Sequence, residues 1–194
     1  MTSGQENTAQ RNFRMKILLL ITGILLAVQG CPPIIKRSGW STRASSCTHN
    51  LSNSLKYAVI HHTDGNRCFS MSACKRQLQN IQSYHMDERG WCDIGYNFLI
   101  GEDGNIYEGR GWTKMGAQTR GYNQISLGIS IMGNFTSVAP NSKALNAAQS
   151  LIQCSALRGY LSSKYTLKGH RQLRSTDCPG NALFKVIQTW PRWA

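Results

Sequence analysis

The chain has 194 residues, 41% of them hydrophobic and 16% charged, and its formal net charge is +13. This length allows one domain with a buried core of its own. The lysines and arginines form no long run, which argues against an arginine-rich arm, and we expect no nucleic-acid partner.

Residues 1–30 have the features of a secretory signal peptide. Basic residues precede a twelve-residue apolar run at 17–28, and the small residue Gly30 stands before the expected cleavage point. The run is shorter than the roughly 20 apolar residues that span a bilayer, so we expect secretion and no stable membrane insertion. A retained signal anchor is the alternative. Met15 is a second candidate start, and the residues before it would then be an upstream extension.

The basic character remains after the expected cleavage. Removing residues 1–30 takes away three basic residues and one acidic residue, which leaves a net charge of +11. A secreted cation suits anionic polymers such as bacterial wall, glycosaminoglycan or phospholipid surfaces. The charge alone does not show whether the protein binds such a polymer or whether the basic residues only keep it soluble.

Residues 31–55 are rich in Ser, Thr, Pro and Asn without a sustained period, which predicts an irregular segment held by Cys31 and Cys47 and anchored by Trp40. Residues 56–194 alternate between strand and helix patterns. Expected strands cover residues 56–62, 95–100, 106–109, 125–132 and 165–168. Expected helices cover residues 70–88, 142–157 and 181–189. This order predicts an α/β fold, a single domain with a central mixed β-sheet flanked by about three helices.

Two of these elements end on histidines. The strand at 56–62 delivers His61 and His62 to an edge of the sheet. In the helix at 70–88, apolar residues recur at steps of three and four, and His85 continues this stripe at the helix end. At that position His85 can point into a pocket.

The cysteine count leaves one thiol over. A secreted chain uses cysteines mainly in disulfides, and seven cysteines form three pairs and one remainder. A free thiol is a liability in an oxidising compartment, so the seventh cysteine is expected to have another role.

One candidate for that role is metal binding. A catalytic zinc takes three protein ligands and keeps one position open, and His61, His170 and Cys178 would supply two imidazoles and a thiolate. A single histidine at a strand end is more often structural, but the leftover cysteine favours ligation. A thiol protease pair of Cys178 and His170 is the alternative chemistry.

Several motifs then identify a family resemblance. They are Val59-Ile-His-His-Thr, the run from Gly90 to Gly101, the run from Asp103 to Trp112, Ser126-Leu-Gly-Ile, Gly169-His-Arg and Cys178-Pro-Gly. They resemble the peptidoglycan recognition proteins, a family similar to phage-type zinc amidases that cut N-acetylmuramoyl-L-alanine bonds. The resemblance covers residues 31–191 and is strongest to the short, secreted vertebrate members. It implies the type 2 amidase fold and a role in antibacterial innate immunity.

The resemblance assigns the catalytic residues. It makes His61, His170 and Cys178 ligands of Zn2+, and it matches Tyr96 to the active-site tyrosine. Thr176 stands where phage amidases place a lysine and catalytic recognition proteins often place threonine. Non-catalytic relatives typically replace the cysteine with serine, so the resemblance implies an active amidase. A binding module without turnover is the alternative.

The resemblance also implies the covalent modifications. The disulfides would be Cys31–Cys154, Cys47–Cys92 and Cys68–Cys74. Asn50 and Asn134 lie in glycosylation sequons, which suit a secreted chain.

The implied partner is bacterial peptidoglycan. We expect the protein to bind it as a monomer or weak oligomer. The positions that match ligand contacts in the family are His62, His85, Arg89, Gly90, Trp91, Tyr96, Arg110, Gln118 and Asn123. Gln118 departs from the histidine of many relatives, and Trp91 can serve as an apolar wall or only as core packing. Gly90-Trp91 together with Arg110 resembles members that prefer diaminopimelate-type muropeptides, because a guanidinium suits the extra carboxylate.

Overall fold

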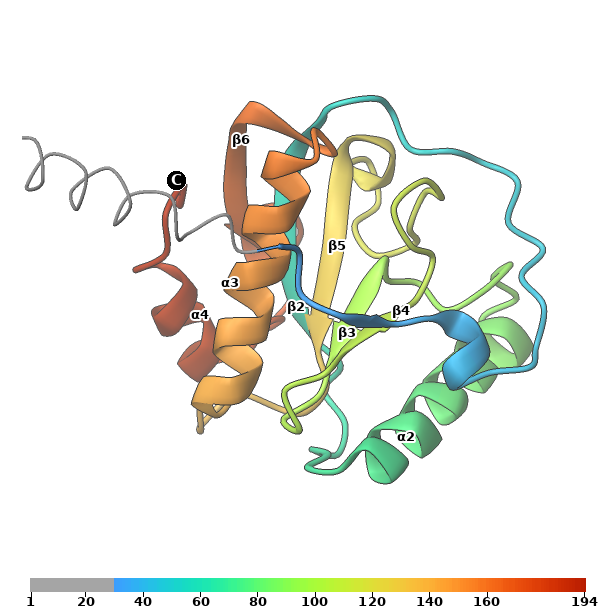
Figure 1. Ribbon diagram of the computed structural model, residues 1–194. Helices are drawn as coiled ribbons and strands as arrows, with labels where there is room; N and C mark the ends of the chain where they lie inside the picture. The colour runs from blue at the N-terminus through green and yellow to red at the C-terminus, as the bar shows by residue number, and fades with distance from the viewer. Residues whose placement is uncertain (1–29) are drawn as a thin grey trace, which may run out of the picture. The chain divides into compact units, whose positions relative to one another are not determined.

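The computed structural model describes residues 30–194, so the predicted signal peptide lies almost entirely outside the described residues. Six strands form one sheet in the order β1-β4-β3-β5-β2-β6 (Figure 1). They are β1 (Ile34–Ile35), β2 (Leu55–His62), β3 (Phe98–Ile100), β4 (Ile106–Glu108), β5 (Ser126–Ile131) and β6 (Leu161–Gly169). Only β3 and β4 pair antiparallel within this sheet; the other neighbours are parallel. The predicted mixed sheet is confirmed.

Within residues 30–194, three α-helices pack on this sheet, as predicted: α2 (Met71–Ser83), α3 (Ser142–Leu157) and α4 (Asn181–Ile187). The side-chain alternation along β3 separates the two faces. Phe98 and Ile100 join the core that α3 and α4 cover, whereas Leu99 joins a second core beneath α2. Figure 1 accordingly shows α3 and α4 near one another and α2 on the other side of the sheet.

Caps and turns fix the helix ends. The side chains of Ser70 and Asn141 accept hydrogen bonds from the third residue of α2 and α3 respectively. The helix predicted over 70–88 is α-helical only to Ser83 and continues as a π-helical turn, η2 (Tyr84–Glu88). Arg89 caps the end of this wider turn and is followed by the Gly90-Trp91 pair.

Two other expectations need adjustment. The extended piece expected at 165–168 lies in the second half of the nine-residue strand β6 (Leu161–Gly169). The first half was not predicted because residues 162–164 are polar. The segment 31–55 is mostly irregular but contains β1 and a 3₁₀ turn at Arg37–Gly39. Trp40 anchors it as expected: the indole is 2% exposed and donates to the carbonyl of Glu108 at 2.9 Å.

The disulfide pattern fits the cysteine count. Cys47 is bonded to Cys92 and Cys68 to Cys74, as predicted. Cys31 and Cys154 are disulfide-bonded too, and the bridge expected between them stays a prediction. Within residues 30–194, no helix has the length and apolar character needed to cross a membrane.

Candidate metal centre

The carboxyl ends of two neighbouring parallel strands bring the two histidines together. Ile60 of β2 is the register partner of Gly169 of β6, and a histidine follows each of them. His61 is the next residue of β2, and His170 begins the 3₁₀ turn η4 (His170–Gln172). Their rings lie 4.5 Å apart between centroids. Crevices at the carboxyl ends of parallel strands are the usual place for ligands in such sheets.

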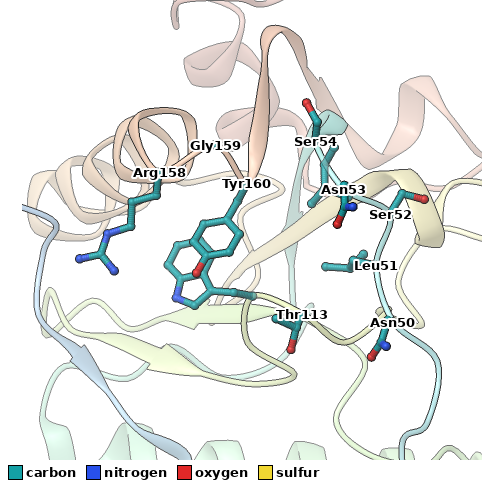
Figure 2. Close-up of a pocket in the computed structure, with 11 residues that line it drawn as sticks. Asn50, Leu51, Ser52, Asn53, Ser54, Thr113, Arg158, Gly159 and Tyr160 are labelled. Carbon is teal, nitrogen blue, oxygen red and sulfur yellow. The ribbon is translucent and has the colours of Figure 1, made fainter.

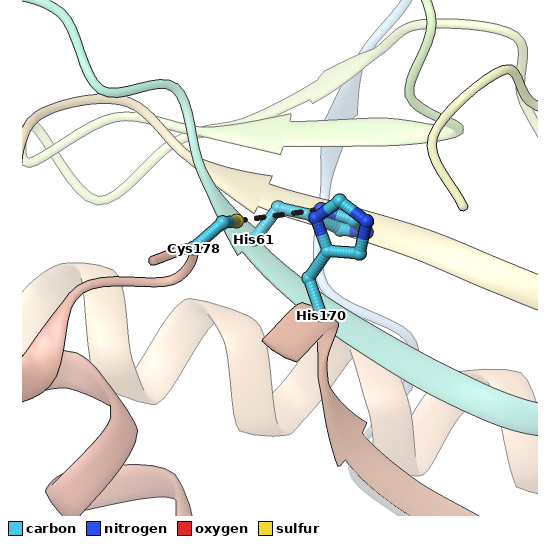
Figure 3. Close-up of side chains that lie close together, drawn as sticks. All are labelled: His61, His170 and Cys178. Atoms are coloured by element: carbon cyan, nitrogen blue, oxygen red, sulfur yellow. Dashed lines mark hydrogen bonds between the residues drawn. The ribbon is translucent and has the colours of Figure 1, made fainter. Parts of the chain in front are cut away.

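The loop before α4 adds the third group. The amide of Arg171 donates to the carbonyl of Cys178 at 3.0 Å and so holds this loop against η4. Cys178 is the free cysteine among the described residues, and its Sγ lies 3.6 Å from Nδ1 of His61 (Figure 3). One ligand atom from each of His61, His170 and Cys178 lies within 4.8 Å of the others.

Burial keeps these three groups uncharged in the absence of a cation. Burial, followed by the proximity of His170, holds the pKa of His61 well below 6.5. Burial and then Arg174 lower the pKa of His170 to about 4. Burial raises the pKa of the Cys178 thiol to about 12, although the amide of His62 donates to its sulfur at 3.4 Å.

Two neutral imidazoles and a partly buried free thiol fit a zinc ion. Neutral imidazole nitrogens offer lone pairs, and a divalent cation would stabilise the thiolate that burial otherwise disfavours. Zinc prefers this mixture of nitrogen and sulfur ligands, and three protein ligands leave a position for substrate or solvent. These residues therefore have the chemistry of an open zinc site.

A row of rings leads away from this centre. The Tyr96 ring lies 5.3 Å from that of His61 and 5.8 Å from that of His85. The His85 ring lies 4.6 Å from that of Trp91, and the guanidinium of Arg89 lies 5.7 Å from the Trp91 ring. His85 is buried and accepts a hydrogen bond at Nδ1 from the backbone. The row joins the metal centre to the surface at Arg89.

The predicted diaminopimelate contact, Arg110, lines a cavity of about 210 Å³ at the end of this row, together with Trp91 and Asn123. Its guanidinium donates three hydrogen bonds to backbone carbonyls, those of Ile94, Met115 and Asp93. These bonds use three of the five N–H donors and fix the guanidinium in place, so two donors remain for a ligand.

Two of the predicted substrate contacts are engaged inside the protein. Nδ1 of His62 accepts from the amide of Phe135 at 3.3 Å, and the residue is 5% exposed. Gln118 is 8% exposed, and its Oε1 lies 2.5 Å from Nε2 of His61. Sequence reasoning missed this contact, because no local pattern around residue 118 indicates what lies behind His61.

The remaining predicted residues lie at the surface. Thr176 is exposed, and its hydroxyl oxygen accepts a hydrogen bond from the amide of Cys178 at 3.3 Å. Gly90 is exposed with φ of +64°, a backbone conformation that favours glycine. The sequon residues Asn50 and Asn134 are both exposed.

A larger pocket of about 500 Å³ lies where β2 begins, at the opposite end of the strand from His61 (Figure 2). Polar residues of the segment before β2 line it, together with the stacked rings of Trp112 and Tyr160. Apart from Asn50, it contains none of the predicted site residues.

Comparison with known proteins gives consistent matches. Residues 51–181 match the family model described as N-acetylmuramoyl-L-alanine amidase. The chain is 49% identical over 178 residues to peptidoglycan recognition protein 1 of Bos indicus, which covers 91% of this chain and 93% of that protein.

Solved structures agree with the sequence matches. The crystal structure of human PGRP-IβC in complex with glycosamyl muramyl pentapeptide superposes with a TM-score of 0.82 at 46% identity, covering 84% of this chain and 99% of that one. Peptidoglycan recognition protein-LE in complex with tracheal cytotoxin, a monomeric diaminopimelic acid-type peptidoglycan, superposes with a TM-score of 0.81 at 44% identity, covering 83% and 95%.

Proposed function

This chain belongs to the N-acetylmuramoyl-L-alanine amidase family and, within it, to the peptidoglycan recognition proteins, and from this membership we propose that it is a zinc-dependent amidase of bacterial peptidoglycan. The reaction would cleave the amide bond between the lactyl group of muramic acid and L-alanine. The observation that carries the proposal is a single free cysteine held beside two histidines. Three protein ligands with a position left open are typical of a catalytic zinc site.

His61, His170 and Cys178 would hold the zinc ion through their nitrogen and sulfur atoms. Zinc bound there would act as a Lewis acid on the scissile carbonyl and would make a water molecule nucleophilic near neutral pH. In the overall reaction, water oxygen bonds to the lactyl carbonyl carbon, the C–N bond breaks, and the amine of L-alanine leaves with a proton.

Tyr96 and Thr176 would stabilise the negative charge that develops on the carbonyl oxygen. Burial, and then the proximity of Cys178, raises the pKa of the Tyr96 phenol, which therefore stays protonated and can donate a hydrogen bond. The hydroxyl oxygen of Thr176 accepts from the amide of Cys178, which leaves its hydrogen to donate to the same charge.

The row of rings and the Arg110 cavity would bind the stem peptide. Tyr96, His85 and Trp91 offer an apolar wall beside the metal centre. Arg110 would pair with the carboxylate that distinguishes diaminopimelate from lysine. The two structural relatives with a bound muramyl pentapeptide and a bound tracheal cytotoxin support binding of a muropeptide by similarity.

We also propose that residues 1–30 are removed and that the remaining chain, an N-terminal segment at 31–55 followed by the domain at 56–194, is secreted. The disulfides Cys47–Cys92 and Cys68–Cys74 suit an oxidising compartment.

The deciding experiment is product analysis of a defined muropeptide incubated with the protein, with and without a chelator. We expect free stem peptide, loss of this product with chelator, and its recovery when zinc is added back. Binding of the muropeptide without release of stem peptide, in zinc-loaded protein, would favour a recognition protein without turnover. Activity that resists chelators but is lost with a thiol alkylator would favour the cysteine-protease alternative.

A further inference from the structure

A directed chain of hydrogen bonds lies behind the metal centre and begins at a backbone carbonyl. The hydroxyl of Ser126 donates to the carbonyl of Tyr122 at 2.8 Å. A carbonyl oxygen only accepts, so this bond uses the single hydrogen of Ser126. Its Oγ must therefore accept from its other neighbour, which is Nε2 of Gln118 at 2.8 Å. This assigns the two ends of the amide: the nitrogen faces Ser126, and Oε1 faces the other way.

The orientation of the amide determines which nitrogen of His61 carries the proton. Oε1 of Gln118 lies 2.5 Å from Nε2 of His61 and also accepts from the hydroxyl of Thr119. An amide oxygen cannot donate, so Nε2 of His61 must carry a hydrogen. An imidazole that binds a metal is neutral, and its second nitrogen then has a lone pair. That nitrogen, Nδ1, is the one that faces Cys178 at 3.6 Å.

Packing keeps the amide in this position. Gln118, Thr119 and Ser126 are all buried, with exposed fractions of 8%, 1% and 0%. The backbone amides of Gln118 and Thr119 both donate to Oδ1 of Asn123, at 2.9 and 2.7 Å. A Cβ at Gly128 would lie 2.5 Å from Cγ of Gln118, so the side chain fills the space that this glycine leaves.

We infer that Gln118 is a positioning residue that holds His61 with Nε2 protonated and Nδ1 directed at the metal. It acts through His61 and is not itself a ligand or a surface contact for substrate. The inference rests on the proposed zinc site and deepens it. Partners of this kind fix the orientation of a ligating histidine, and their loss typically lowers metal affinity about 10- to 100-fold.

Zinc affinity of three variants tests the inference. Gln118→Leu removes the acceptor with little change in size, and we expect zinc to bind about 10- to 100-fold more weakly. Gln118→Glu keeps an acceptor towards His61, while the hydroxyl of Ser126 can turn to donate, so we expect affinity within a few-fold of wild type. The matched control is Gln82→Leu, at a buried glutamine that bonds Asp93 and Ser41, and it should leave zinc affinity unchanged.

Nitrogen NMR of the histidine rings in the metal-free wild type gives a second readout that needs no variant and no zinc. We expect His61 to be the Nε2–H tautomer at pH 7. A proton on Nδ1, or a Gln118→Leu variant that is folded and binds zinc as tightly as wild type, would overturn the inference. If Gln118→Leu does not fold, the inference is tested by the tautomer of His61 in the wild type and by the zinc affinity of Gln118→Glu. A wild type that binds no zinc would refute the proposed function, whereas the tautomer would still test the role of Gln118.

Discussion

Ile60 of β2 and Gly169 of β6 are register partners in a parallel pair of strands. Because a histidine follows each of them, one register places both imidazoles at the same edge of the sheet. A Cβ on Gly169 would lie 2.9 Å from the Phe184 ring of α4, so β6 approaches this helix closely at the point where the chain turns towards His170. Strand register and helix packing thus position the two histidines of the candidate metal centre, and Cys178 comes from a loop.

Replacing Cys178 with serine should separate hydrolysis from binding. A serine hydroxyl is a poor zinc ligand compared with a thiolate, so we expect Cys178→Ser to lose zinc and amidase activity. The row from Tyr96 to Trp91 does not depend on the thiol, so muropeptide affinity should stay within a few-fold of wild type. Zinc content, stem-peptide release and muropeptide titration measure the three effects. Joint loss of binding and folding would mean that the metal is structural.

The sequence was sufficient to predict the fold class and three residues that the structure brings together, but not the surroundings of those residues. His61 could be proposed from its place at a strand end, and the odd number of cysteines indicated one free thiol, but the choice of Cys178 as that thiol depended on the family resemblance. The role of Gln118 could not be predicted, because its contact with His61 depends on how the strand β5 and the loop at 118–126 pack. The limits of β6 were also missed: Leu161 pairs with Leu55 of β2 and Thr166 pairs with Tyr57, and the polar residues 162–164, which have little strand tendency of their own, lie in the irregularity between these two pairs.

Removing the phenol hydroxyl of Tyr96 should slow the reaction without removing the metal. We expect Tyr96→Phe to lower kcat about 100-fold or more, a typical cost of losing one donor to a developing oxyanion. Zinc affinity should be unchanged, because Tyr96 is not one of the three proposed ligands. Single-turnover kinetics on a defined muropeptide, together with zinc titration, checks both expectations. A rise in KM with kcat unchanged would instead assign Tyr96 to substrate binding.

The stability of the metal-free protein should fall as the pH drops from 6.5 to about 4. Burial, followed by Arg110 and Arg89, lowers the pKa of His85 from 6.5 to about 4. Between these values the unfolded chain binds a proton that the folded protein excludes, so acid favours unfolding. Below pH 4 both states are protonated, and this contribution stops changing.

The effect of His85 should be on the order of 1–3 kcal/mol in the free energy of unfolding. Melting temperatures at several pH values between 7 and 4, with chelator present, measure it. Protonation of carboxylates, of His61 and of His170 also destabilises the metal-free protein in acid, so His85→Gln serves as the control: its melting temperature should fall less over this range. An identical pH profile for wild type and variant would show that His85 is not the group responsible.

Arg110 should decide between the two types of stem peptide. Arg110 lines a cavity together with Trp91 and Asn123, and the backbone carbonyls use three of its five N–H donors. A hydrogen bond to a charged group contributes roughly 1.5–3 kcal/mol. We therefore expect Arg110→Ala to weaken binding of a diaminopimelate-type muropeptide about 10- to 100-fold, and of a lysine-type muropeptide much less. Calorimetric titration with both ligands measures the ratio of the two affinities.

The structural role of Arg110 makes a control necessary, because its guanidinium also bonds the carbonyls of Ile94, Asp93 and Met115. Arg110→Lys keeps the charge but cannot satisfy three carbonyls and a carboxylate in the same planar arrangement. It should retain part of the preference for diaminopimelate. If Arg110→Ala weakens the binding of both muropeptides equally and also lowers the melting temperature, Arg110 only supports the loop. Another residue would then determine the ligand preference.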